Sequence, residues 1–245
     1  MPRYKIIIEY DGTGLAGWQR QDHDPSVQQY IEQAIKNFSR EDVVVHGAGR
    51  TDAGVHALGQ VAHFDLNKNY PVKEVKGAIN YNLKPNKIII TDCVEVDTNF
   101  HSRFSAIKRY YRYDILNRDS HCIFDIDRAW HVRDELNILN MQKASRLLLG
   151  EHDFTSFRAA KCQAKSAVKT MDEIKISKEN ERIILNLKAT SFLHHMVRNI
   201  VGSLVLVGMN KWKIEDIKTA LEEKDRSKAG PTAPACGLYF LKVDY

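Results

Sequence analysis

The order of strand-like and helix-like segments is the feature that most restricts the fold of this 245-residue chain. Residues 3–10 alternate as an apolar strand, and apolar residues at helical spacing follow Ser26, with Gln29 as its capping-box partner. Strands at 43–46 and 60–65, a helix through Val72, Val75 and Ile79, and a strand at 87–96 complete a β-α-β-β-α-β order. This is the order of a ferredoxin-like unit.

The second half repeats this order. We predict a strand at 105–116, a helix at 134–149, strands at 169–177 and 182–190, a long helix at 192–207, a short one at 214–221 and a closing strand at 237–245. The chain is therefore expected to be α+β, with two ferredoxin-like halves, residues 1–104 and 105–245. We expect the halves to join into one extended mixed, mainly antiparallel sheet with helices on one face and a central cleft.

Composition excludes several classes of protein. No run approaches the roughly 20 apolar residues that a membrane-spanning helix needs, and the N-terminus lacks the pattern of a signal peptide. The four cysteines, Cys93, Cys122, Cys162 and Cys236, form no CxxC pair. We expect a cytoplasmic protein with reduced thiols and no membrane contact, and the net charge of +5 favours an anionic partner.

Residues 12–17 match the GxGxxG pattern of dinucleotide-binding oxidoreductases. That pattern should open directly into a helix, whereas here polar residues and Pro25 precede the helix that starts at Ser26. A split β-α-β-β order also argues against a parallel sheet. The oxidoreductase interpretation is therefore disfavoured.

A glycine-lined loop at residues 47–57 joins two predicted strands and carries Arg50 and Asp52. Glycine allows positive φ and close backbone approach, so such a loop can present both charged groups to a bulky ligand from a rigid base. The alternative is that Asp52 forms an Asx turn over Ala53 and Gly54 while Arg50 is solvated. The residues alone leave both interpretations open.

Residues 100–113 interleave basic and aromatic side chains without an acid, as expected of a surface that meets phosphates and stacked bases. On a strand, Arg109, Tyr111 and Tyr113 share one face, and one of the two faces must be core. The alternative is an edge strand protected by charge. The candidate nucleic-acid contacts, including those of a second basic stretch, are Arg103, Lys108, Arg109, Arg158, Lys161 and Lys165.

The predicted helix at 192–207 is apolar almost all round, so Arg198 needs an anionic partner. The neighbouring His194 and His195 cannot both face one metal from a helix, and His56 and His63 come with no acidic or thiol set. We predict no metal site, and we interpret His194 as a core or RNA-facing residue.

Residues 49–57, followed by 60–64 (Gln-Val-Ala-His-Phe), resemble the active-site signature of the tRNA pseudouridine synthase A family. The resemblance covers nearly the whole chain, in blocks at 10–13, 18–21, 100–106, 111–113, 152–154, 194–202 and 233–238. Lys161 and Ala167 depart from the usual pattern, where glycine and proline are expected.

The resemblance implies a cofactor-free isomerase that turns uridine into pseudouridine at positions 38, 39 and 40 of the tRNA anticodon stem-loop. It implies that Asp52 is the nucleophile, that Tyr111 packs on the extruded uracil and that Arg198 pairs with Asp52. It also implies that Arg50 helps to extrude the nucleotide, that the cleft binds RNA and that the protein is a homodimer.

The chemistry of the reaction supports the assignment of Asp52 independently of the resemblance. Cleavage of a carbon–nitrogen bond needs a group that forms a covalent adduct, and an ionised carboxylate can do so. Nothing is oxidised and no group is imported, so no metal or other cofactor is expected. The alternative is a non-catalytic RNA-binding protein of ferredoxin-like fold, which would have no use for Asp52 and Arg198 together.

Overall fold

The computed structural model describes residues 1–21, 24–160 and 162–245, which form two compact units. The first unit comprises Met1–Ile107 together with Tyr239–Tyr245, and the second comprises Lys108–Leu238. The division differs from the expected halves, 1–104 and 105–245, chiefly in the last strand, which lies with the first unit.

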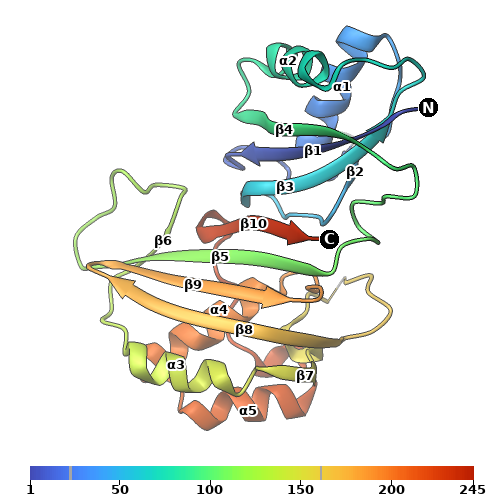
Figure 1. Cartoon of the computed structure of the whole chain (residues 1–245). Coiled ribbons are helices and arrows are strands. Elements are labelled where there is room, and N and C mark those ends of the chain that lie inside the picture. Colours follow the sequence, from blue (N-terminus) through green and yellow to red (C-terminus); the bar gives the residue numbers. More distant parts are fainter. Residues whose placement is uncertain (22–23, 161) are drawn as a thin grey trace. The chain divides into compact units, whose positions relative to one another are not determined.

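The first unit is a sheet covered by two helices (Figure 1). Its elements are β1 (Arg3–Tyr10), α1 (Val27–Ser39), β2 (His46–Gly47), β3 (His56–Asp65), α2 (Val72–Leu83), β4 (Ile88–Val96) and β10 (Leu238–Asp244). β1 pairs antiparallel with both β3 and β4, while β2 pairs antiparallel and β10 parallel with β3. The predicted β-α-β-β-α-β order is confirmed here.

The core of this unit follows from the predicted periodicities. Alternate residues of β1, namely Tyr4, Ile6 and Ile8, are fully buried, and Ile31 and Ile35 are fully buried on α1. The backbone N–H of Gln29 donates to Ser26 Oγ at 3.3 Å, which caps α1 as expected.

The strand predicted at 43–46 is wrong, since β2 contains only His46 and Gly47. Two side chains of α1 bind the backbone of Val45 instead: its N–H donates to Glu32 Oε1 at 3.0 Å, and its carbonyl accepts from Gln28 Nε2 at 3.1 Å. The peptide groups that would form a ladder are satisfied by the helix. β3 also begins earlier than predicted, at His56 rather than residue 60.

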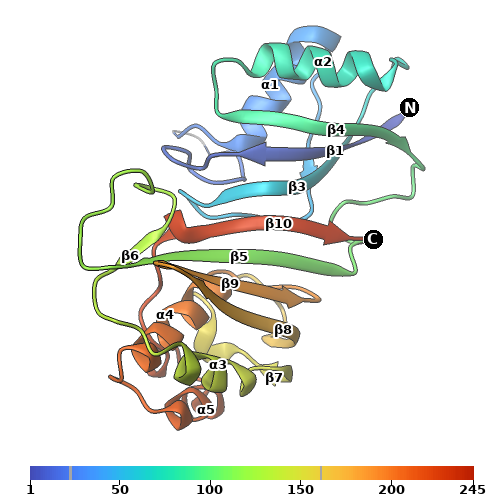
Figure 2. The ribbon, with the colours of Figure 1, turned by 60° about the vertical axis from the view of Figure 1, so that its left-hand side comes forward.

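The strands of the second unit have three helices gathered on one side of them (Figure 2). Its elements are β5 (Lys108–Asn117), β6 (Trp130–Val132), α3 (Ile138–Arg146), β7 (Gly150–Asp153), β8 (Val168–Glu179), β9 (Arg182–Ala189), α4 (Met196–Gly208) and α5 (Ile214–Glu223). Three antiparallel pairings give the order β5-β9-β8-β7, and β6 lies parallel to β5.

Two helix starts in this unit were predicted wrongly. α3 begins at Ile138 rather than 134, because Asn137 is its N-cap and accepts from the N–H of Asn140 at 3.0 Å. α4 begins at Met196 rather than 192, because His195 has a left-handed backbone with φ of 62° that a helix cannot include. His194 and His195 therefore precede the helix. The short strands β6 and β7 were not predicted.

The α+β class and the mainly antiparallel sheets are confirmed. A central cleft stays a prediction. Within the part of the chain that the structure describes, no helix is long and apolar enough to cross a membrane.

Candidate active site

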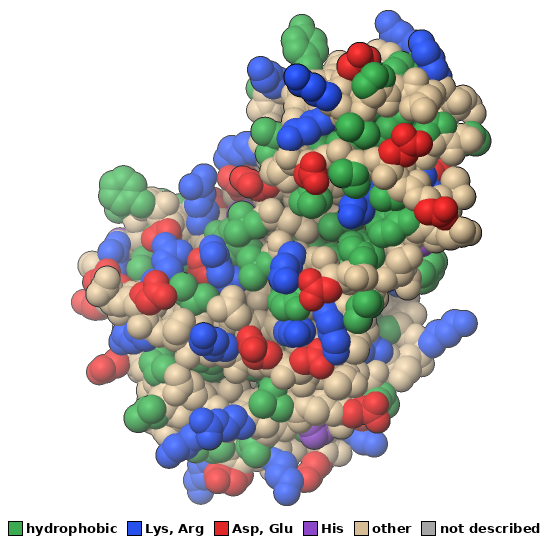
Figure 3. Space-filling view, in the orientation of Figure 1, with side chains coloured by type: hydrophobic (Ala, Val, Ile, Leu, Met, Phe, Trp, Pro, Cys, Tyr) green, Lys and Arg blue, Asp and Glu red, His purple; other side chains and the backbone are tan. Residues whose placement is uncertain are grey.

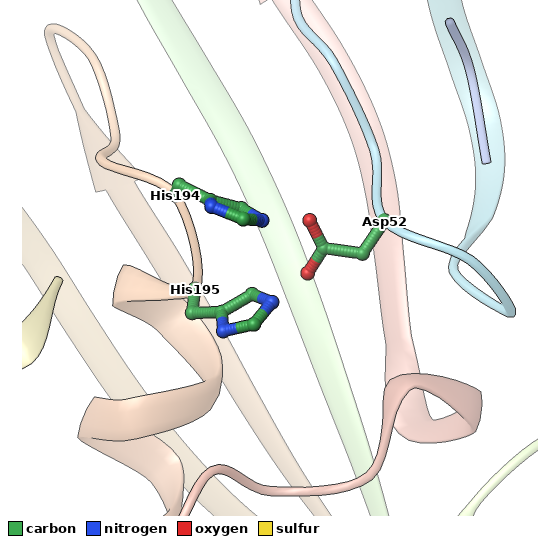
Figure 4. A group of neighbouring side chains, drawn as sticks. All are labelled: Asp52, His194 and His195. Carbon is green, nitrogen blue, oxygen red and sulfur yellow. The ribbon is translucent and has the colours of Figure 1, made fainter. Parts of the chain in front are cut away.

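Asp52 lies on the loop that leads into β3 (Figure 4). A turn follows it, in which the N–H of Val55 donates to the main-chain carbonyl of Asp52 at 3.2 Å. Gly54 has a φ of 77°, a left-handed conformation that glycine adopts without steric cost. The turn is thus closed by the backbone of Asp52, whereas the Asx-turn interpretation assigned this role to its side chain.

The GxGxxG segment lies directly against this loop. The N–H of Trp18 donates to the carbonyl of Thr51 at 3.0 Å, and that of Gly54 to the carbonyl of Leu15 at 3.3 Å. A Cβ on Gly12 would lie 2.1 Å from the carbonyl oxygen of Val55, and one on Gly17 would lie 2.4 Å from that of Thr51. The glycines therefore allow two backbones to touch, a role that the sequence did not suggest.

Side chains from the sheet fix the other side of the loop. The Tyr10 hydroxyl and Thr51 Oγ1 are 2.7 Å apart, and burial raises the pKa of Tyr10, which keeps that hydroxyl protonated. Gln60 Nε2 donates to the carbonyl of Gly49 at 2.9 Å. Residues on both sides of Asp52 are thus fixed. The sequence analysis missed Tyr10 and Gln60, whose only signal was their place in the blocks that carry the family resemblance.

In the second unit, Tyr111 and Tyr113 belong to the buried face of β5. The ring of Tyr111 meets Phe192 edge-on, with centroids 4.9 Å apart. The hydroxyl of Tyr113 donates to the carbonyl of Pro234 at 2.7 Å. Tyr111 and Tyr113 therefore lie on the less exposed face of β5, a point that the sequence left open.

The cations of β5 have partners within the second unit. Lys108 Nζ donates to both carboxylate oxygens of Asp172 at 2.7 Å, and Arg109 Nη1 donates to the carbonyl of Thr190 at 2.7 Å. Arg112 Nε lies 2.9 Å from Asp114 Oδ1. These contacts fit a charged surface of the sheet as well as an RNA contact.

Arg198 stands on the first turn of α4 and is fixed by the segment at 230–234. Its Nε donates to the carbonyl of Ala233 at 2.7 Å, and the N–H of Ala233 donates to the carbonyl of Arg198 at 3.1 Å. This segment approaches α4 closely, since a Cβ on Gly202 would lie 1.8 Å from the carbonyl oxygen of Pro231.

A buried polar network holds the same segment. Asn199 is fully buried; its Nδ2 donates to the carbonyl of Phe157 at 2.8 Å. Its Oδ1 accepts from Thr232 Oγ1 at 2.7 Å and from Arg226 Nη2 at 3.1 Å. Asn199, Thr232 and Arg226 thus hold the backbone segment that binds Arg198. Of the three, only Asn199 lies in a block that carries the family resemblance, 194–202.

The remaining candidate contacts lie on the surface or close to it. Arg50, Arg103, Lys165 and His194 are exposed, Arg158 is half-buried, and Lys161 lies outside the described residues. His194 and His195 precede α4 (Figure 4), with rings 4.1 Å apart, so the argument that placed both on a helix is wrong. In the face shown in Figure 3, basic side chains are interspersed with acidic ones.

The sequence profile of a family described as tRNA pseudouridine synthase matches residues 6–105 and 144–245. The chain belongs to this family and is therefore an isomerase that converts uridine into pseudouridine in tRNA. A protein of Afipia carboxidovorans named tRNA pseudouridine synthase A is 49% identical over 100% of both chains. One of Maricaulis maris with the same name is 50% identical over 100% of this chain and 98% of its own.

Among solved structures, a chain in a crystal structure of a Cbf5–Nop10–Gar1 complex aligns with 82% of this chain at 10% identity and a TM-score of 0.37. The alignment spans 44% of that chain, and so remote a likeness carries no argument about the fold or the site.

Proposed function

We propose that this isomerase acts on uridines 38, 39 and 40 of the tRNA anticodon stem-loop and that Asp52 is its nucleophile. The observation that carries the assignment of Asp52 is the fixed loop. Thr51 on one side and Gly54 on the other are hydrogen-bonded to the segment at 12–18, and the Tyr10 hydroxyl is hydrogen-bonded to Thr51 Oγ1. A surface carboxylate without a chemical role would not need such support.

The fixed loop suits nucleophilic catalysis because a carboxylate held in place meets its target without a search over conformations. Asp52 attacks the flipped uridine, at the base or at the ribose, and the N1–C1′ bond breaks. The uracil turns, a C5–C1′ bond forms and the bond between Asp52 and the substrate breaks. The proton then leaves C5, and N1 gains one. The product has the composition of the substrate, so no co-reactant is needed.

Other residues have supporting roles in this proposal. Arg198 pairs with the Asp52 carboxylate, Tyr111 packs on the uracil, and Arg50 takes the place of the extruded nucleotide. The guanidinium of Arg198 is held by the Ala233 carbonyl, which fits a group that must stay in one orientation. We further propose that the protein acts as a cytoplasmic homodimer that grips one tRNA across both copies.

The test uses tRNA tritiated at uridine C5, from which the reaction releases tritium. Asp52→Asn should lower release by about 10³-fold or more while tRNA binding persists. Asp92→Asn, which changes an exposed carboxylate on β4, is the control and should release tritium at the wild-type rate. Undiminished release by Asp52→Asn would remove the nucleophile assignment and favour a non-catalytic role for this residue.

The positions are tested separately with tRNAs in which uridine 38, 39 or 40 is replaced by cytidine one at a time. Each replacement should remove the release that belongs to that position. Full release from a tRNA without uridine at all three positions would contradict the proposed target.

A further inference from the structure

The segment at 99–106, between β4 and β5, displays a pair of neighbouring side chains to solvent. Phe104 is 78% exposed and Arg103 is exposed beside it. Single exposed apolar side chains are common on protein surfaces, so exposure alone assigns no role to Phe104, and its surroundings decide.

The backbone beneath Phe104 is tightly fixed. The N–H of Ser105 donates to the carbonyl of His101 at 2.9 Å, and the N–H of His101 donates to Ser105 Oγ at 2.9 Å. The N–H of Arg103 donates to His101 Nδ1 at 3.1 Å. The loop is also tied to the sheet, since Ser102 Oγ donates to the carbonyl of His46 at 2.5 Å. Exposure of Phe104 is thus combined with a rigid support, as in a preformed binding site.

The chemistry of the two side chains is complementary. The guanidinium carbon of Arg103 lies 5.8 Å from the centre of the Phe104 ring, and the ring of His101 lies 4.4 Å from it. The run from 99 to 113 contains no acid. An aromatic face offers stacking to any base, and an adjacent guanidinium meets the phosphate that the base carries.

We propose that Arg103 and Phe104 form a subsite for an unpaired nucleotide of the tRNA, distinct from the target uridine. Its base stacks on Phe104 and its phosphate contacts Arg103. This inference rests on the proposed action on an anticodon stem-loop, whose loop supplies unpaired bases. A stacking site without hydrogen-bond readout tolerates any base, so it fits an enzyme that must hold tRNAs of different sequence.

The first test compares Phe104→Ala with Phe104→Trp and with Tyr81→Ala. Tyr81 on α2 is 76% exposed and serves as the matched control. Phe104→Ala should weaken tRNA binding by about 5- to 100-fold, as the loss of one base–aromatic stack does. Phe104→Trp should restore binding, and Tyr81→Ala should leave it unchanged.

The second test identifies the base. tRNAs with one abasic nucleotide at each loop position are bound to the wild type and to Phe104→Ala. One abasic position should weaken wild-type binding as much as the mutation does, and the two losses should not add. Additive losses at every position would overturn the subsite. Arg103→Ala should lower the slope of log affinity against log salt by about one, while Lys73→Ala on α2 should leave it unchanged.

Failure of the proposed subsite can be distinguished from failure of the proposed nucleophile. In single turnovers at saturating enzyme, Phe104→Ala should react at the wild-type rate, whereas Asp52→Asn should bind and not react. If Phe104→Ala changes the oligomeric state in sedimentation and leaves tRNA affinity intact, the residue contacts a protein and the subsite is refuted.

Discussion

Replacing Gly17 by alanine should displace the Asp52 loop, because the added Cβ would lie 2.4 Å from the carbonyl oxygen of Thr51 and 2.8 Å from the carbonyl carbon of Asp52. Both contacts are to backbone, so no side-chain rotation relieves them. Gly17 also has a φ of 95°, which costs a residue with Cβ about 1–2 kcal/mol. Overpacking adds about 1–3 kcal/mol, for a total loss of stability of about 2–5 kcal/mol.

Gly14→Ala is the matched control. Gly14 has a φ of 76°, and its Cβ would meet nothing within 4 Å, so this change carries the backbone strain without the clash. It should cost about 1–2 kcal/mol. The difference in stability between the two variants isolates the contact with the Asp52 loop.

Activity should separate the variants more than stability does. A displacement of about 1 Å at a reacting group can cost about 100-fold in rate. We expect tritium release to fall to that extent in Gly17→Ala and to stay near wild type in Gly14→Ala. Urea unfolding gives the stabilities, and rates are measured where both variants are folded. Equal activity of the two folded variants would refute the view that this segment positions Asp52.

Three further predictions concern other parts of the molecule. Asn199→Ala should lower kcat more than it weakens tRNA binding, because Thr232 and Arg226 lose their shared acceptor. Measurements of kcat and of tRNA affinity on the same variant check this. An equal loss in both would contradict a positioning role. Burial, followed by the charge of Arg3 and the neighbouring His101 and His46, lowers the pKa of His63 to about 4, while the nearby Asp65 opposes the shift. The unfolded imidazole therefore takes up a proton first, and stability should fall from about pH 6.5 to 4 by up to about 1.4 kcal/mol per pH unit. His63→Gln should flatten this part of the curve in urea unfolding at pH 7, 6 and 5, and an unchanged slope would contradict the assignment. Glu32→Ala should lower the free energy of unfolding by about 2–3 kcal/mol in the same assay, because the carboxylate binds Arg20, Gln28 and the N–H of Val45. Glu74 on α2 is exposed, so Glu74→Ala should leave that free energy almost unchanged.

Elements whose signal is local could be predicted from the sequence. The alternation of β1 and the Ser26 cap of α1 depend on neighbouring residues, and both are confirmed. The pattern at 43–46 also looked local, but Glu32 and Gln28 of α1 take up the backbone of Val45. A strand prediction fails where distant side chains satisfy the peptide groups.

The candidate site shows the same limit. Asp52 could be singled out because it lies with Arg50 in a glycine-lined loop and because that loop resembles a family signature. The support given by Gly12 and Gly17 could not be predicted, because their partner lies more than 30 residues further along the chain. The contacts of Asn199 could not be predicted for the same reason, since its partners are at 157, 226 and 232.

The pairing of β10 with β3 has a consequence for biosynthesis. Tyr239 lies opposite His56 and Phe240 opposite Ala57, immediately after the Asp52 loop. During translation, the whole second unit is made between these two strands. A nascent chain therefore presents β3 with one border unpaired for most of its synthesis, a state in which it is prone to wrong pairing. The pairing of β3 in the first unit is therefore complete only after the second unit has been synthesised.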